Sequence, residues 1–355
     1  MKRWLGVVAV AVAVLGASCS GSESVDAPAP APAPIEEPSY AVGFREITVT
    51  DPARPGRELP VAVWYPVAPD VDTSGLEPTF YSLVGEIGTE STIAFNDAPP
   101  AEGPFPLIVF SHGNGGTRTQ STFLTEALAR RGFVVASPDH VGNTAADLLT
   151  GAGVSQVQSA LDRPLDVSAV IDDMVASDDL LVDGEHIGMT GHSFGGFTTL
   201  VMGAGDDDRI DALAPIAPAS TPIGDEALAS IELPTLLVGG TLDTTTPIDP
   251  NTTRPFELLG SEELYKVDVI DAGHLSFAGI CAPAAEYAAL PDAVPLIKGY
   301  LDGLADDGCS DEFADVESVH ELTNRYVVAF FAKTLLGDDA AEDLTPVDGV
   351  AFVAR

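Results

Sequence analysis

A serine stands among glycines in the stretch GHSFGG, residues 191–196, and this stretch decides the fold. The apolar run 187–189 precedes it and an apolar helical stretch follows it, so the pattern G-x-S-x-G lies where a strand turns into a helix. Such a sharp turn strains the backbone and leaves little lateral room, which explains the glycines two positions before and after the serine. The sequence therefore predicts a nucleophile elbow that lifts the Ser193 hydroxyl above a sheet, beside a helix N-terminus that favours developing negative charge.

Short apolar runs recur on both sides of this stretch. Two segments with two-residue alternation, 44–49 and 59–67, predict an antiparallel lead-in. The later runs are continuous, as is typical of strands buried on both faces of a parallel sheet. They lie at 106–110, 133–136, 187–189, 212–216, 236–239 and 266–270. Helical periodicity separates them, most clearly at 167–175 and 319–336. The alternation predicts an α/β fold, a mostly parallel twisted sheet with helices on both faces.

A second glycine-rich turn, SHGNGG at 111–116, follows the predicted strand 106–110. Hydrolases of this architecture place their other oxyanion donor at this turn. We expect the backbone N–H groups of Asn114 and Phe194 to hold the oxygen of a tetrahedral intermediate, where losing one donor costs a factor of about 10²–10³ in rate. A dinucleotide-binding loop is excluded because Arg118 stands where G-x-G-x-x-G requires its third glycine.

The serine needs a general base, and the chain has six histidines. His274 follows the last predicted parallel strand and comes after the serine, as the chain order Ser, acid, His requires. His140 also lies past a strand end and competes for the role, although it precedes Ser193. The other four are expected to have structural or surface positions: His112 buried in a turn and bonded to backbone, His192 with its ring directed away from the serine, and His186 and His320 on the surface.

An aspartate that could orient the base lies between the serine and His274. Asp243 stands just beyond the run 236–239, 50 residues after Ser193 and 31 before His274. Such a carboxylate would fix the imidazole tautomer and stabilise the imidazolium. Other acidic residues compete in so acidic a chain, namely Asp249, Asp268 and Asp271. Asp243 is preferred because it alone lies at a strand's C-terminal end in the required interval.

The motifs carry a family resemblance when they are taken in chain order. SHGNGG, GHSFGG, GGTLD at 239–243 and AGHLSF at 272–277 resemble the α/β-hydrolase branch that contains platelet-activating-factor acetylhydrolases, cutinase-like bacterial polyester hydrolases and dienelactone-hydrolase-like esterases. WYPV at 64–67 and RPLDV at 163–167 are also similar to acetylhydrolase-like members. The resemblance spans roughly residues 40–336. It implies serine-ester chemistry, with the triad and oxyanion donors assigned as above.

Two departures from the polyester hydrolases bear on the substrate. The segment 214–220 lacks the tryptophan that those enzymes carry beside the cleft, and Phe194 stands where they usually carry methionine. The cysteine nucleophile of dienelactone hydrolases proper is also absent. We therefore expect a serine carboxylic-ester hydrolase, similar to the acetylhydrolases, that acts through an acyl-enzyme on short-acyl or phospholipid-like esters. A polyester or cutin hydrolase or a lipase is the alternative, and a non-catalytic cell-surface binding module is the alternative of another class.

The charge balance narrows the choice of partners. The 355 residues include 16 Lys and Arg against 54 Asp and Glu, for a formal net charge of −38. This field repels phosphate backbones and anionic membrane surfaces, so we expect no nucleic-acid partner. No His or Cys pair has zinc-ligand spacing, and we expect neither a metal nor another cofactor. The expected partner is a small-molecule or lipid-like ester, bound by a monomer.

The N-terminus has the pattern of an export signal. Lys2 and Arg3 precede the apolar run 4–15 and a small-residue stretch that ends at Cys19. Residues 15–19 resemble the lipobox of bacterial lipoproteins, whose cysteine is lipidated, although Gly16 stands where leucine is usual. We expect residues 1–19 to be a signal peptide of the lipoprotein type. The product is then exported, as a cell-surface lipoprotein or as a secreted or periplasmic protein, and contacts a membrane only through that anchor.

Three segments follow the signal. Residues 20–39 are rich in Pro and Ala and should form a disordered tether, 40–340 should form one catalytic domain, and 341–355 a C-terminal tail. Once Cys19 is lipidated or removed, Cys281 and Cys309 remain as an even pair in an exported chain. We expect them to form a disulfide.

Overall fold

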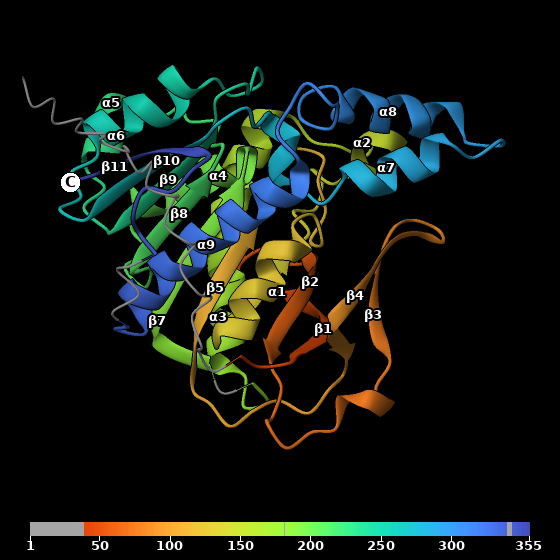
Figure 1. Ribbon diagram of the computed structural model, residues 1–355. Coiled ribbons are helices and arrows are strands. Elements are labelled where there is room, and N and C mark those ends of the chain that lie inside the picture. The colour runs from red at the N-terminus through yellow and green to blue at the C-terminus, as the bar shows by residue number, and fades with distance from the viewer. Residues whose placement is uncertain (1–38, 181, 339–342) are drawn as a thin grey trace, which may run out of the picture. The chain divides into compact units, whose positions relative to one another are not determined.

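The computed structural model describes residues 39–180, 182–338 and 343–355 (Figure 1). The predicted signal peptide, the lipidation site Cys19 and all but the last residue of the predicted tether lie outside these residues. None of the described helices is long and apolar enough to cross a membrane.

The described strands form one eleven-stranded sheet in the order β11-β10-β9-β8-β7-β5-β6-β2-β1-β4-β3. Strands β6, β5, β7, β8, β9 and β10 are parallel, and β2 joins them antiparallel through β6. The bounds are β1 Val42–Thr50, β2 Glu58–Pro66, β3 Pro78–Val84, β4 Ile87–Asn96, β5 Phe105–Ser111, β6 Val134–Pro138, β7 Val182–His192, β8 Ala212–Ile216, β9 Thr235–Gly240, β10 Leu264–Val269 and β11 Val350–Ala354. This sheet confirms the predicted α/β fold class.

Helices cover both faces of the sheet, and each face has its own apolar cluster. Their bounds are α1 Thr122–Arg131, α2 Ala145–Thr150, α3 Gln156–Ala176, α4 Phe194–Gly203, α5 Asp225–Ala229, α6 Arg254–Leu258, α7 Cys281–Ala288, α8 Pro295–Ala305 and α9 Val316–Leu335. On one face, α1 and α9 lie side by side and pack on Ile108 and Phe110 of β5 (Figure 1). On the other, α3 and α4 pack on Leu107 and Val109 of the same strand. Successive β5 residues therefore enter opposite layers, as their alternation around a strand requires.

The end of the chain differs from the prediction. Residues 350–354 do not form a free tail but add strand β11 antiparallel to the edge strand β10. The ring of Phe352 packs against Tyr265 and stacks on Tyr326, which explains why so short a segment joins the sheet. The sequence did not indicate this strand beyond residue 340, because a five-residue run with one aromatic anchor gives little periodic signal.

Two units that the sequence did not predict, the hairpin β3–β4 and the helix pair α7 and α8, stand at the carboxyl end of the parallel strands. The apolar hairpin residues Leu83, Val84 and Ile87 pack against helices α7 and α8.

The predicted disulfide is confirmed: Cys281 and Cys309 are bonded, with their Cα atoms 5.3 Å apart. Because the bond joins the start of α7 to the chain just after α8, it closes residues 281–309 into one unit, which we call the cap.

Reduction of this disulfide should lower the stability of the protein. In the chain-entropy account, a loop of 28 residues stabilises the folded chain by about 3–4 kcal/mol. We expect the double substitution Cys281→Ser with Cys309→Ser to lower the Tm by roughly 5 °C in thermal denaturation. Dithiothreitol should do the same to the wild type and leave the double variant unchanged. An unaltered wild-type Tm, with the bond shown to be reduced by mass spectrometry, would contradict this account.

Candidate active site

The serine elbow forms where β7 ends and α4 begins. Ser193 lies between them with φ 58° and ψ −114°, a region that non-glycine residues rarely occupy. The glycines of the motif let the turn approach β5: a Cβ on Gly195 would overlap the carbonyl oxygen of Ser111, and one on Gly191 would lie 2.5 Å from the same oxygen. The elbow is therefore built against the end of β5, where the second glycine-rich turn begins.

The three residues predicted as a triad are joined through hydrogen bonds of His274. His274 Nε2 is 2.8 Å from Ser193 Oγ, and His274 Nδ1 is 2.8 Å from Asp243 Oδ2. The Asp243 carboxylate also accepts hydrogen bonds from the backbone N–H and the hydroxyl of Thr246, at 2.6 and 2.7 Å. Because a carboxylate only accepts, the proton of neutral His274 lies on Nδ1, which leaves Nε2 free to accept the serine proton.

The competing carboxylates are engaged elsewhere or exposed. Asp268 pairs with Lys266, whereas Asp249 and Asp271 are exposed to solvent. Asp243 is the carboxylate that the structure brings to Nδ1 of His274.

The predicted oxyanion donors lie on the two turns that meet at the elbow. A Cβ on Gly113 would lie 3.5 Å from the Cβ of Ser193, so the turn 111–116 passes directly beside the serine. Phe194 is the first residue of α4, and the first N–H groups of a helix have no acceptor within it. Within the described part of the chain, the N–H groups of Asn114 and Phe194 have no backbone or side-chain acceptor. Both remain available to a ligand oxygen.

Two supporting side chains were not foreseen. Gln120 Oε1 accepts from the Gly113 N–H at 2.9 Å, and its amide nitrogen donates to His192 Nδ1 at 3.0 Å. Gln120 therefore joins the second turn to the elbow. It gave no sequence signal because it lies in no motif.

The second unforeseen side chain is Asp307 of the cap. One of its oxygens accepts from the backbone N–H groups and hydroxyls of Thr244 and Thr245, next to Asp243, and the other from the His274 N–H at 3.1 Å. Burial opposes its charge, but the hydrogen bonds from His274 and the two threonines outweigh burial and lower the pKa of Asp307. One carboxylate thus joins the loop that carries the acid to the loop that carries the base.

His140, the competing base, belongs to a different cluster. Its Nε2 lies 2.9 Å from Ser111 Oγ and its Nδ1 3.0 Å from Asp166 Oδ2. This second Ser, His, Asp arrangement is fully enclosed, with each of the three residues at most 1% exposed. No substrate can reach Ser111, and the structure brings His140 to that serine rather than to Ser193.

The remaining histidines divide as follows. His112 is buried and bonds the Gly113 carbonyl at 2.7 Å, as expected. His192 donates from Nε2 to the His274 carbonyl at 3.0 Å, and exposed His186 pairs with Asp183. The expectation for His320 was wrong: its ring stacks on Phe123 with centroids 3.6 Å apart and is largely covered. The pattern of α9 did not reveal that neighbour.

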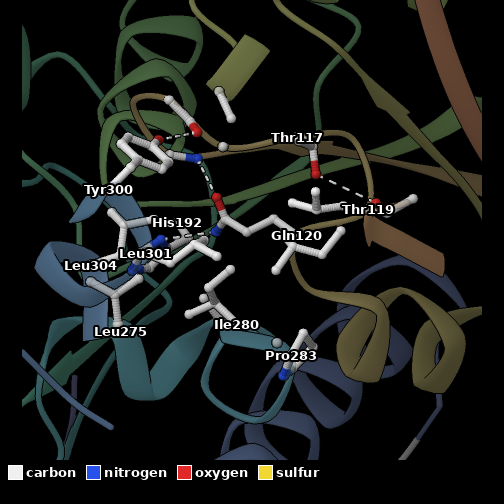
Figure 2. A pocket seen from close by; sticks show the side chains of 18 of the residues that line it. Thr117, Thr119, Gln120, His192, Leu275, Ile280, Pro283, Tyr300, Leu301 and Leu304 are labelled. Carbon is white, nitrogen blue, oxygen red and sulfur yellow. Dashed lines mark hydrogen bonds between the residues drawn. The ribbon is translucent and has the colours of Figure 1, made fainter. Parts of the chain in front are cut away.

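A cavity of about 300 Å³ opens beside Ser193 and His274. Its walls come from the turn 111–116, the β3–β4 hairpin, the loop that carries His274, and the cap. Figure 2 shows Leu275, Leu301 and Leu304 grouped on one side of the cavity and Gln120 on the other. Tyr300 fixes the cap to the second turn, since its hydroxyl donates to the Gly115 carbonyl at 2.7 Å. In the residues that the structure describes, no group of three or more His, Cys, Asp or Glu side chains could hold a metal ion.

Comparison with known proteins places this site in a family. Residues 96–306 match the sequence model of proteins described as PET hydrolase-like, which covers more than half of the chain. The chain belongs to the PET hydrolase-like family. This membership confirms the predicted α/β-hydrolase branch with its cutinase-like members.

Individual relatives agree with this family. The chain is 29% identical over 158 residues to cutinase 2 of Thermobifida cellulosilytica, a match that covers 44% of this chain and 55% of that protein. It is 30% identical over 159 residues to cutinase est1 of Thermobifida alba, covering 44% and 49%. The chain thus spans about half the length of the curated relatives it matches. A ferulic acid esterase from Streptomyces cinnamoneus has the same fold, with a TM-score of 0.67, 22% identity, and coverage of 91% of this chain and 98% of that one.

The enclosed His140 should make stability depend on pH. Burial and the nearby Arg163 lower the pKa of His140 to about 4, despite the opposing effect of Asp166. Between about pH 6.5 and 4 the unfolded chain therefore binds a proton that the folded chain does not, so stability is lost as the pH falls. We expect the free energy of unfolding of the wild type to fall by roughly 1–3 kcal/mol more than that of His140→Gln between pH 7 and 4.5.

Urea denaturation at a series of pH values measures this difference. His186→Gln, a substitution of a histidine whose side chain is 48% exposed, is the matched control and should follow the wild type. Parallel stability curves for the wild type and His140→Gln would refute the assignment.

Proposed function

We propose that this chain is a serine carboxylic-ester hydrolase that acts through an acyl-enzyme on Ser193. The observation that carries the proposal is the pair of 2.8 Å distances that link Ser193, His274 and Asp243 at a strained strand-to-helix elbow. Membership of the PET hydrolase-like family supports the same chemistry.

The geometry suits each step of this reaction. Ser193 Oγ attacks the ester carbonyl carbon while its proton passes to His274 Nε2, and Asp243 stabilises the resulting imidazolium. The carbonyl oxygen becomes an oxyanion that the N–H groups of Asn114 and Phe194 hold. The intermediate collapses, and the C–O bond to the alcohol breaks as His274 returns the proton to the leaving oxygen. Water then attacks the acyl-enzyme by the same route, which releases the acid and restores Ser193.

The substrates we propose are short-acyl or phospholipid-like esters. The apolar wall formed by Leu275, Leu301 and Leu304 and the cavity volume of about 300 Å³ support a small apolar group at this position. A polyester or cutin hydrolase is the second candidate, which the PET hydrolase-like family and the cutinase relatives favour. The disulfide supports export, since such bonds persist in oxidising compartments.

Replacement of the nucleophile tests the proposed function. Ser193→Ala should reduce hydrolysis of p-nitrophenyl acetate by several orders of magnitude and abolish labelling by a fluorophosphonate, because among the described residues Ser193 is the serine paired with His274. Ser82→Ala is the matched control, since Ser82 lines the same cavity without contact to a histidine, and it should still be labelled. Labelling of Ser193→Ala would overturn the nucleophile assignment. A wild type that is inert to an ester panel and to the probe would instead favour the binding-module alternative.

Substitutions in α8 test the proposed acyl preference. Leu304 lines the cavity, whereas Leu296 on the same helix is 64% exposed and does not. Leu304→Trp should lower the rate on p-nitrophenyl octanoate relative to the rate on the acetate. Each acyl methylene group that is no longer buried in the cavity costs about 0.8 kcal/mol, which is about fourfold in rate. Leu296→Trp should leave the ratio unchanged. An octanoate-to-acetate ratio that Leu304→Trp does not alter would refute the acyl site, and faster hydrolysis of polyester film than of soluble esters would favour the second candidate.

A further inference from the structure

A buried arginine lies beneath the turn that carries Asn114. Arg163 of α3 is 0% exposed, and its guanidinium reaches the end of β5. Its Nη1 donates to the His112 carbonyl at 2.6 Å and to Ser111 Oγ at 3.2 Å. Its Nη2 donates to the Gly113 carbonyl at 3.1 Å and to Asn143 Oδ1 at 2.6 Å. One planar group therefore holds consecutive carbonyls of the turn.

The bond to Gly113 bears directly on an oxyanion donor. The Gly113 carbonyl and the Asn114 N–H belong to one planar peptide unit and point in opposite directions. A donor on the carbonyl therefore fixes the orientation of that N–H, and a charged donor also polarises the peptide so that its N–H donates more strongly.

A second contact reaches Asn114 through Asn143. While Asn143 Oδ1 accepts from Arg163, its amide nitrogen donates to Asn114 Oδ1 at 2.8 Å, and its carbonyl accepts from the Gly115 N–H at 3.1 Å. The peptide that follows Asn114 is therefore held as well as the peptide that precedes it. The turn cannot rotate around Asn114 without breaking this set.

The same guanidinium also touches the residue that carries the other donor. Its carbon lies 4.7 Å from the centroid of the Phe194 ring, a cation–π distance. The ring also stacks on Phe197, at 5.3 Å between centroids. Arg163 is thus in contact with the residues on both sides of the predicted oxyanion position.

The charge of Arg163 is not neutralised by a direct ion pair with any described carboxylate. Its acceptors are neutral carbonyl, amide and hydroxyl oxygens, and its Nη2 also lies 3.4 Å from Nδ1 of His112. The nearby Asp166 is instead bonded by Arg54, Arg57 and His140. A buried cation with neutral acceptors gives a positive field that favours an anion formed at the adjacent N–H groups.

We infer that Arg163 is the positioning residue of the oxyanion hole, which fixes the Asn114 and Phe194 donors at once and adds a positive field behind them. This inference rests on the proposed ester hydrolysis. Lysine could not replace it, because an ammonium is a point charge without the planar fork that spans several acceptors.

The test is Arg163→Lys, with Arg57→Lys as its matched control. Arg57 is a neighbouring arginine that donates two hydrogen bonds to Asp166, and none of its hydrogen bonds reaches the turn or Phe194. We expect Arg163→Lys to lower kcat on p-nitrophenyl acetate about 10–100-fold while KM changes less than about threefold, since one complete oxyanion donor is worth 10²–10³. Arg57→Lys should stay within about twofold of the wild type in kcat.

A trifluoromethyl ketone provides a readout that a merely structural role would not move. The serine oxygen adds to its carbonyl and forms a stable tetrahedral oxyanion, so its inhibition constant reports the oxyanion hole. Arg163→Lys should raise this constant by the same factor by which it lowers kcat. If Arg163→Lys does not fold, Phe194→Leu, which keeps the backbone donor and removes the ring, should show a smaller parallel change in both quantities.

The outcomes separate this inference from the proposed function. An unreactive wild type would overturn the proposed function itself. A reactive wild type with an inactive Ser193→Ala, together with unchanged kcat and ketone affinity in Arg163→Lys, would overturn the role of Arg163 alone. Equal losses in Arg57→Lys and Arg163→Lys would also overturn it, because the effect would then belong to the buried charge cluster as a whole. If Arg163→Lys does not fold, unchanged kcat and ketone affinity in Phe194→Leu would overturn it as well.

Discussion

The close approach of Gly195 to the carbonyl of Ser111 is the constraint on which the site depends. No side chain fits between the elbow and the end of β5, so the two turns meet backbone to backbone. That contact places the start of α4 beside the turn that carries Asn114. Residues far apart in the sequence then converge, because the carboxyl ends of neighbouring parallel strands lie at one edge of the sheet.

Prediction from the sequence succeeded where a residue type has one structural role that the nearby sequence makes evident. The glycines around Ser193 and the continuous apolar runs indicated the elbow and the parallel strands, and the even cysteine pair indicated the disulfide. It failed where contacts are made between distant segments. Asp307 and Gln120 lie in no motif, and β11 depends on the packing of Phe352 against rings from two other elements. Such contacts become visible only once the chain is folded.

Burial decides between two similar sets of residues. Ser193 and His274, which is bonded to Asp243, line a cavity, while Ser111, His140 and Asp166 have nearly the same connectivity and are enclosed. Each histidine follows a strand, so in the sequence only the chain order Ser, acid, His favours His274 over His140. In the enclosed set, burial raises the pKa of Asp166, but hydrogen bonds from Arg57 and His140 outweigh it and lower that pKa to about 2. The enclosed set thus supports the turn, whereas Ser193 of the other set is accessible from the cavity.

The position of Asp307 has a consequence for how this scaffold can change. The cap supplies Pro283, Ile297, Tyr300, Leu301 and Leu304 to the wall of the cavity, so an exchange of caps is the simplest route to a new substrate range. Yet the carboxylate that joins the acid loop to the base loop belongs to that same segment, close to the disulfide. A replacement of the whole cap would therefore alter both the cavity wall and the support of the loops that carry Asp243 and His274. An engineered graft would have to retain the end of the cap while replacing its helices.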